Sequence, residues 1–288
     1  MWLRSFISKL NHKRLDSRSA RKLRERKKKL EYFGAFAKGV YVETGQGKFI
    51  VNPADAFVSK SLLQKGGYGL HEIQLAKNYL NESSTCLVLG GHIGSIAIPL
   101  SKISKNVHVF EANPETFNYL TANVALNNCS NITLYNFAVS DSVSDISFII
   151  QEANSGSSRR KPITAFEPVS YEVGREIRVK AQVLDEFLHD LYPDLIFMDI
   201  EGSEYFALKG AQKILSRTKA LIMEFDSGYF KRVSGKSAYE IWDVFAPHFS
   251  RLISPRYNKN FEGTDAVKGE VLRMIESDES HENIVFLK

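Results

Sequence analysis

The stretch FMDIEGSEYFALKGA carries three carboxylates within six residues, directly after an apolar run. They are Asp199, Glu201 and Glu204, and Gly202 between them permits a sharp turn of the backbone. Like charges this close together cost free energy unless they bind a cation or share a proton. Glu224 lies in the next apolar run, ALIMEF, and adds a fourth carboxylate. This pattern predicts a site that holds a cation or moves a proton.

A glycine-rich turn in CLVLGGHIGS, residues 86–95, is a second candidate site. Gly90, Gly91 and Gly94 let the backbone turn tightly and approach a ligand closely. Alone, such a turn is equally typical of an ordinary strand–helix junction. Glu111 ends the next apolar run, and an acid there can accept hydrogen bonds from both hydroxyls of a ribose. Together the two features predict an adenosine-containing cofactor.

A ribose-binding acid does not identify the cofactor, because NAD and S-adenosylmethionine (SAM) both contain ribose. The carboxylates around Asp199 distinguish the two by charge. They would repel the phosphates of a dinucleotide and attract the sulfonium cation and free amine of SAM. We therefore expect SAM.

Several stretches resemble the FkbM-type SAM-dependent methyltransferase family in order and spacing, over roughly residues 40–288. They are LGGHIGS, VHVFEANPETFNYLTANVALNN, NFAVSD, VLDEFL, LIFMDIEGSEYFALKGAQ and LIMEFD. The resemblance implies a Rossmann-like class I methyltransferase fold, with a seven-stranded, mostly parallel sheet, an antiparallel last strand and helices on both faces. It also implies methyl transfer to a hydroxyl of a sugar, a glycan or glycolipid, or a related small molecule.

The resemblance further implies roles for individual residues. The cofactor-binding positions are Leu89, Gly90, Gly91, His92 and Gly94 in the turn, Glu111, Ala112 and Asn113 near the ribose, Ala138 and Asp141 beside the adenine, and Asp199 at the methionine end. Asp141 is the expected partner of the adenine amino group. Asp199, Glu201 and Glu224 are the candidate catalytic residues.

The first turn departs from the family pattern Asp-x-Gly-Ala-Asn-x-Gly. Val88 stands at the Asp position, Gly91 at Ala and His92 at Asn. Valine removes a carboxylate that ordinarily organises the turn. Histidine still offers a ring nitrogen for a hydrogen bond, but it is bulkier than asparagine and titrates near neutrality. The alternative for His92 is an ordinary surface turn residue.

Methyl transfer requires the acceptor oxygen, the methyl carbon and the sulfur to lie in line. An alcohol acceptor also needs a general base. In parallel α/β sheets, ligands bind beyond the carboxyl ends of the strands at the switch point, where the strand order reverses. We rank Asp199 first, because it ends the strand nearest this point and neighbouring carboxylates raise its pKa toward neutrality. The alternative is that these carboxylates only orient the cofactor amine and cap a helix.

Strands and helices alternate along most of the chain, which predicts an α/β fold. We expect a hairpin over 40–52, strands over 85–89, 106–111, 132–139, 145–150, 176–181, 194–200, 220–225 and 282–288, and helices over 71–82, 94–104, 114–128, 184–191, 204–215 and 237–249. The chain divides into a basic arm (1–38), a segment that packs on the cofactor site (39–84) and a SAM-binding domain (85–288).

The net charge of +5 is unevenly distributed, because residues 1–30 hold 12 Lys and Arg and two acids. The remainder is mildly acidic, which argues against a broad nucleic-acid surface there. No apolar run approaches the roughly 20 residues of a membrane span. The two cysteines give neither a disulfide framework nor metal-ligand spacing. We therefore expect a cytoplasmic protein without a metal.

The basic arm has three interpretations. MWLRSFISKL places its apolar side chains on one face of a helix, and the basic run RKLRERKKKL follows. This combination suits the surface of an anionic membrane, where each basic residue contributes about 1 kcal/mol. A solvated tail is the second interpretation, and nucleic-acid binding is the third and least favoured.

The polar loop 152–176 lies on the side where we expect acceptors to enter. Arg159, Arg160 and Lys161 in this loop could meet a carboxylate or phosphate on a glycan, or could simply be solvated.

Two other functions compete with the small-molecule methyltransferase. An RNA methyltransferase would explain the basic arm, although the acidic body and the lack of a recognisable RNA-binding module argue against it. A non-catalytic descendant of the fold would explain Val88.

Overall fold

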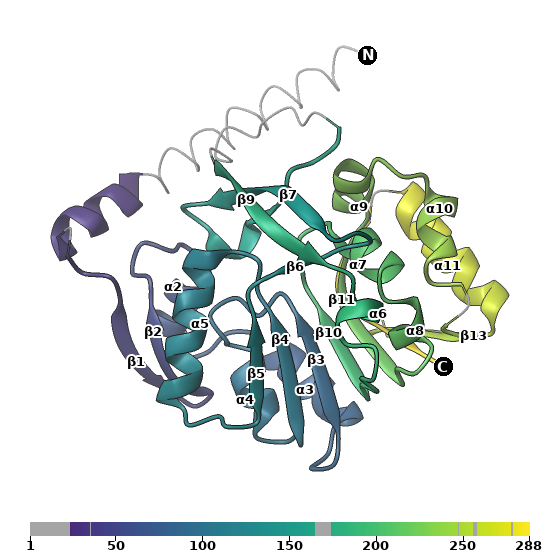
Figure 1. Ribbon diagram of the computed structural model, residues 1–288, viewed down its shortest axis with the longest axis horizontal. Coiled ribbons are helices and arrows are strands. Elements are labelled where there is room, and N and C mark those ends of the chain that lie inside the picture. The colour runs from purple at the N-terminus through teal and green to yellow at the C-terminus, as the bar shows by residue number, and fades with distance from the viewer. Residues whose placement is uncertain (1–23, 35, 165–173, 247, 256–257, 278) are drawn as a thin grey trace.

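The computed structural model describes residues 24–34, 36–164, 174–246, 248–255, 258–277 and 279–288, so the apolar face expected in residues 1–10 lies outside them. A central sheet has the strand order β13-β12-β14-β11-β10-β3-β4-β5 (Figure 1). Its strands are β3 (Thr85–Leu89), β4 (Asn106–Phe110), β5 (Ile132–Tyr135), β10 (Leu195–Met198), β11 (Ala220–Asp226), β12 (Arg251–Ser254), β13 (Lys259–Glu262) and β14 (Ser280–Leu287).

The parallel part of this sheet runs from β11 to β5, and the last strand, β14, is antiparallel to β11 and β12. The predicted mostly parallel α/β sheet with an antiparallel last strand is therefore confirmed. The sheet has one strand more than the predicted seven, because β13 pairs with β12 at the edge. The switch point lies between β3 and β10, whose following helices belong to opposite faces.

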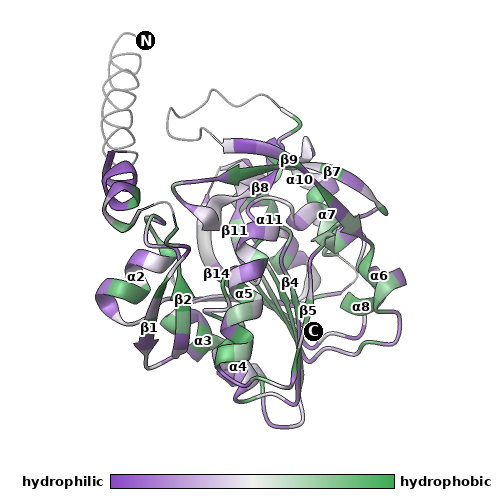
Figure 2. Ribbon diagram, turned by 60° about the vertical axis from the view of Figure 1, so that its left-hand side comes forward, coloured by the Kyte–Doolittle hydropathy of each residue, from purple (hydrophilic) through white to green (hydrophobic). Residues whose placement is uncertain are grey.

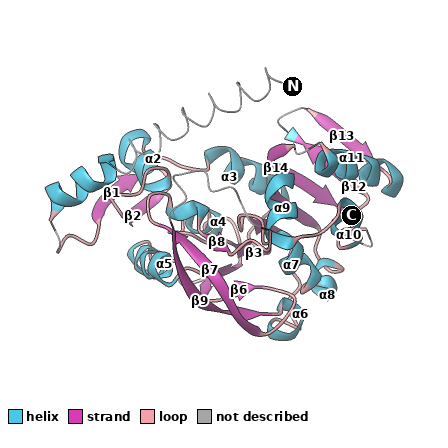
Figure 3. Cartoon of the chain, turned by 90° about the horizontal axis from the view of Figure 1, so that it is seen from above, coloured by secondary structure: helices cyan, strands magenta, loops and turns pink. Residues whose placement is uncertain are grey.

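Helices cover both faces of the central sheet (Figure 3). Along β3, Cys86 and Val88 pack into one apolar layer and Leu87 and Leu89 into the other, as the two-residue period of a strand requires. The parallel strands of the sheet are accordingly mostly hydrophobic (Figure 2). One layer contains α2 (Val58–Lys65), α3 (Leu70–Ala76), α4 (Ala97–Ser101) and α5 (Pro114–Leu126); the other contains α6 (Leu184–Phe187), α7 (Glu204–Lys209), α8 (Gln212–Leu215), α9 (Ser227–Ser234), α10 (Ala238–Asp243) and α11 (Thr264–Glu276).

A second, four-stranded sheet lies across the carboxyl ends of the parallel strands (Figure 1). It consists of β6 (Ala138–Val139), β9 (Gly174–Gln182), β7 (Ser144–Gln151) and β8 (Arg159–Arg160), in that order. The predicted pairing of the segments 145–150 and 176–181 is confirmed, but the single strand predicted over 132–139 is wrong. The side chain of Asn136 donates a hydrogen bond to the carbonyl of Glu111, 2.8 Å away, and the chain there leaves the central sheet for the second one.

Several helices are shorter than predicted. The helix after the glycine turn begins at Ala97 rather than Gly94, because Gly94 has a φ of +92° that no α-helical residue adopts. The segment 204–215 divides into α7 and α8 at Gly210, where an added Cβ would lie 2.0 Å from the carbonyl oxygen of Ser140. The segment 237–249 is helical only from Ala238 to Asp243. In the segment 71–82, α3 passes into a 3₁₀ turn that ends at Tyr79. No helix in the described ranges is long and apolar enough to cross a membrane.

The predicted hairpin is present as β1 (Val40–Thr44) and β2 (Gly47–Val51), and α5 holds it by side-chain amides. Asn123 accepts a hydrogen bond from the backbone N–H of Ile50 at 2.6 Å and donates to the carbonyl of Ile93 at 2.9 Å. Asn127 pairs in the same way with the N–H and carbonyl of Lys48, at 2.9 and 2.6 Å. The two amides thus satisfy a free strand edge and join the hairpin to the glycine turn.

We expect Asn123→Ala to lower the free energy of unfolding by about 2–4 kcal/mol, because it leaves buried backbone groups without partners. Chemical denaturation measures this loss. Asn118→Ala, on the exposed side of the same helix, is the control and should change the value by less than about 0.5 kcal/mol. Equal effects of the two substitutions would contradict the structural role of Asn123.

Candidate active site

The glycine turn after β3 is fixed to the ends of both neighbouring strands. The backbone N–H groups of Gly90 and Gly91 donate to the carbonyl of Phe110, at 3.0 and 2.8 Å. An added Cβ at Gly90 would lie 1.8 Å from the carbonyl oxygen of Asp199, and one at Gly91 would lie 2.3 Å from the side chain of Val109. Only glycine allows this close approach, so the turn, β4 and β10 meet at one place.

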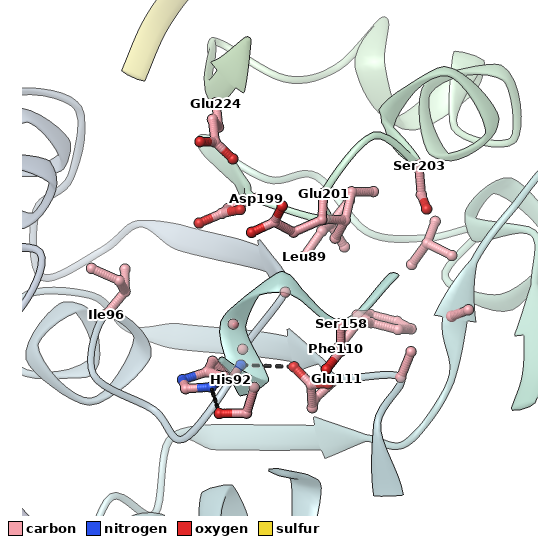
Figure 4. A pocket seen from close by; sticks show the side chains of 18 of the residues that line it. Leu89, His92, Ile96, Phe110, Glu111, Ser158, Asp199, Glu201, Ser203 and Glu224 are labelled. Atoms are coloured by element: carbon pink, nitrogen blue, oxygen red, sulfur yellow. Dashed lines mark hydrogen bonds between the residues drawn. The ribbon is translucent and has the colours of Figure 1, made fainter. Parts of the chain in front are cut away.

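A cavity of about 380 Å³ opens at this meeting point (Figure 4). Most of the predicted site residues line it, namely Leu89, Gly90, Gly91, His92, Glu111, Ala112, Ala138, Asp199, Glu201 and Glu224. The carboxylates of Asp199, Glu201 and Glu224 lie along one side, and His92 and Glu111 lie on the opposite side. Residues that the sequence did not indicate also line the cavity, among them Phe57, Tyr68, Phe148 and Ser155.

Three predicted cofactor-binding residues lie outside the cavity wall. Gly94 packs against α4, where an added Cβ would meet the side chain of Ile98 at 2.9 Å. Asn113 caps α5 by accepting a hydrogen bond from the N–H of Glu115. Asp141 forms an ion pair with Lys209, with 2.9 Å between carboxylate and ammonium. Gly94 and Asn113 thus have structural contacts in the turn and at the start of α5, and their contacts with the cofactor stay predictions.

Glu111 organises the side of the cavity below the turn. Its two carboxylate oxygens accept hydrogen bonds from the backbone N–H groups of His92 and Asn113, both at 2.8 Å. Burial raises the pKa of Glu111 to about 7, although these two hydrogen bonds favour the charged form. Each oxygen keeps a further lone pair, so the carboxylate can still accept hydrogen bonds from a ligand.

His92 joins the turn to two segments that cover the cavity. Its Nε2 lies 2.8 Å from the hydroxyl of Ser155, and that hydroxyl and the backbone N–H of Ser155 both donate to Asp55 at 3.0 Å. The hydroxyl proton points to Asp55, so Ser155 accepts from the N–H at Nε2 of His92. Burial lowers the pKa of His92, and the ring is neutral at pH 7. His92 is thus an anchor of the turn and not a surface residue.

Val88 is not among the residues that line the cavity. It is fully buried in the apolar layer that also contains Cys86 and Val109. A carboxylate at position 88 would be buried in this layer, so Val88 is the residue type that the surrounding packing requires.

The three candidate catalytic carboxylates come from the end of β10 and from β11. One oxygen of each lies within 4.8 Å of the others, and Glu201 is held at a φ of 54°. Burial and the neighbouring acids raise the pKa of Glu224 to about 10, so it holds a proton at pH 7 and donates it in a hydrogen bond to Asp199. Burial also raises the pKa of Asp199 and of Glu201. Such a cluster can share a metal ion or an organic cation, or accept a proton.

Glu204, the remaining acid of this stretch, has a structural role. It is buried, and its carboxylate accepts a hydrogen bond from the N–H of Ile200 at 3.1 Å, which closes the turn before α7. Burial raises its pKa to about 8.

The three basic residues predicted to meet an acceptor point to different places. Arg159 is buried on β8, with its guanidinium carbon 5.2 Å from the ring centre of Tyr229. Arg160 lines the cavity. Lys161 lies at the surface in an ion pair with Glu176 at 2.8 Å. They do not form one anion-binding site.

The raised pKa values predict how stability depends on pH. In the folded protein Glu224, Glu204 and Glu111 bind protons up to pH values of about 10, 8 and 7, whereas the unfolded chain releases them near 4.5. Because the folded state then binds more protons, the free energy of unfolding of the ligand-free protein should fall as pH rises from 7 to 9. Denaturant titrations across this range measure the slope.

Glu224→Gln should make that slope shallower by up to about 1.4 kcal/mol per pH unit, since glutamine does not titrate. The exposed Glu82→Gln is the matched control and should leave the slope unchanged. A slope that is the same in the Glu224 variant and the wild type would show that Glu224 is ionised in the folded protein.

Solved structures similar to this chain include the methyltransferase FkbM from Methylobacillus flagellatus KT, with 15% identity and a TM-score of 0.38, and the match covers 72% of this chain and 44% of that one. This chain thus spans less than half of that structure. A protein from Streptococcus mutans in complex with SAH has 10% identity and a TM-score of 0.42. The match covers 76% of this chain and 96% of that one. An rRNA methylase from Streptococcus thermophilus has 12% identity and a TM-score of 0.42. The match covers 76% of this chain and 93% of that one. No curated protein matches the chain.

The family described as methyltransferase FkbM domain matches residues 89–253, more than half of the chain. The match includes the glycine turn, Glu111 and the three carboxylates of the cavity. The chain therefore belongs to the FkbM family of SAM-dependent methyltransferases.

Proposed function

We propose that this methyltransferase acts on a hydroxyl of a sugar, a glycan or glycolipid, or a related small molecule. The observation that supports it is a cavity with a ribose-compatible acid on one side and three clustered carboxylates on the other. The class of acceptor follows from the resemblance to the family, and the cavity adds groups that can take a proton from an alcohol.

The residues of the cavity fit SAM. Glu111 has free lone pairs for the ribose hydroxyls, and Asp199 and Glu201 face the opposite side, where they can stabilise an ammonium and a sulfonium. Apolar side chains at one end of the cavity, including Phe137 and Phe148, suit a flat base. When bound, SAM supplies an activated methyl group.

Asp199 is the residue best placed to accept the proton of the acceptor hydroxyl. Its carboxylate accepts a hydrogen bond from protonated Glu224, which holds it in place and leaves its second oxygen for the acceptor. Burial raises the pKa of Asp199 above that of a solvated aspartate, which makes its carboxylate a stronger base. Glu201 contributes negative charge beside the site.

We expect Asp199→Asn to lower kcat at saturating SAM by about 100-fold or more, because asparagine cannot accept the proton. Steady-state kinetics with the identified acceptor measure this effect. Asp190→Asn removes an exposed carboxylate outside the cavity and is the control for a general change of charge. Wild-type kcat in the Asp199 variant would show that Asp199 is not the base.

The acceptor class can be tested directly. The purified protein with SAM should add about 14 Da to members of a panel of sugars, glycolipids and polyhydroxylated small molecules, as measured by mass spectrometry. Total tRNA and rRNA belong in the same panel. Methylation of RNA with none of the hydroxylated small molecules modified would overturn the proposed acceptor class, while the SAM-dependent activity would stand.

A further inference from the structure

We propose that Arg160, rather than Asp141, contacts the adenine base of SAM, and that Asp141 positions Arg160 through Ser140. The proposal rests on the placement of SAM in the cavity described under the proposed function. The family resemblance implies that Asp141 contacts the adenine; the proposal assigns this contact to Arg160, which has the opposite charge.

Arg160 is held on two sides within the cavity wall. Its guanidinium carbon lies 3.8 Å from the ring centre of Phe206 in α7, and its Nη1 donates a hydrogen bond to the hydroxyl of Ser140 at 3.1 Å. The side chain is half-buried, and burial lowers its pKa without removing its charge. Stacking and one hydrogen bond fix the plane of the guanidinium and leave its other N–H groups for a ligand.

A chain of hydrogen bonds leads from Arg160 to Asp141. The hydroxyl of Ser140, which is fully buried, accepts from Arg160 and donates to one carboxylate oxygen of Asp141 at 3.3 Å. The other carboxylate oxygen pairs with Lys209 at 2.9 Å. Both oxygens of Asp141 therefore have partners outside the cavity, and the charge nearest the cavity is that of Arg160.

The surroundings of Arg160 suit a flat base. Arg160 lies directly opposite Phe148 in the pairing of β7 with β8, and Ser140 follows Val139 of β6. Phe148 and Val139 both line the cavity, and so do Phe137 and Ala138 from the same region. The carboxylate cluster belongs to other strands, β10 and β11 and the turn after β10. Among the described residues that line it, the cavity thus has an acidic region and a separate apolar region whose one cationic side chain is Arg160.

The hydrogen-bonding groups of arginine determine which atoms of the adenine Arg160 can contact. Arginine offers only donors, and the acceptors of adenine are its ring nitrogens. Asp141 could have accepted a hydrogen bond only from the exocyclic amine. Arg160 therefore donates a hydrogen bond to a ring nitrogen of the base, N1, N3 or N7.

Binding of S-adenosylhomocysteine (SAH), measured by calorimetry, tests this without an acceptor. Arg160→Met keeps an apolar stem over Phe206 but removes the donors, and it should raise Kd about 10-fold. Asp141→Asn should raise Kd about 3-fold. The double variant should bind no more weakly than Arg160→Met, because Asp141 acts through Arg160. If the fold-increase of Kd in the double variant equals the product of those in the two single variants, Asp141 contacts the ligand independently of Arg160, and the proposal is overturned.

Analogues of SAH identify the nitrogen that is read. One of the 1-deaza, 3-deaza and 7-deaza analogues should bind the wild type more weakly than SAH does, and should bind Arg160→Met as well as SAH does. Lys161→Met, a change at the neighbouring surface cation, should leave the Kd for SAH unchanged. If all three analogues bind the wild type as tightly as SAH does, the contact with a ring nitrogen is overturned.

Glu111→Gln separates failure of this proposal from failure of the SAM placement. If it weakens SAH binding while Arg160→Met does not, the placement stands and Arg160 does not read the base. If neither weakens binding, the placement itself is wrong. A raised KM for an anionic acceptor in Arg160→Met, with an unchanged Kd for SAH, would assign Arg160 to the acceptor instead.

Discussion

The two hydrogen bonds that the Glu111 carboxylate accepts determine the geometry of the whole site. One comes from His92 in the glycine turn and the other from Asn113 at the start of α5, so a single side chain joins two loops that follow different strands. Glycine at positions 90 and 91 is the other half of this constraint, because any side chain there would overlap the ends of β10 and β4. The position of the cavity follows from these contacts.

The site brings three carboxyl groups together in a place where they are poorly solvated, and this opposes the stability of the ligand-free protein. Asp199, Glu201 and Glu224 lie together, and burial raises the pKa of each. A ligand that brings positive charge relieves this repulsion, so binding and the ionisation of the cluster are linked. The same residues can thus favour a cationic cofactor and take up a proton from an acceptor.

The sequence predicted the parts of the fold that depend on local pattern. The pattern of apolar residues predicts the parallel strands and the hairpin. The carboxylates meet at the cavity because parallel strands have their carboxyl ends at the same edge of the sheet. The separation of β5 from β6 could not be predicted, because it depends on the contact of Asn136 with the backbone of Glu111. The position of Asp141 outside the cavity likewise depends on Lys209, which lies 68 residues further along the chain.

His92 illustrates why a departure from a family pattern has to be judged in three dimensions. In sequence, histidine for asparagine and valine for aspartate both suggest a weakened turn. In the structure Val88 fits an apolar layer, and the longer side chain of His92 reaches Ser155 and, through it, Asp55. An asparagine is too short to span the same distance from the turn. The turn is therefore held by the Glu111 carboxylate on one side and, through the side chain of His92, by the covering segments on the other. His92 takes part in both contacts, so it links the shape of the turn to the position of those segments.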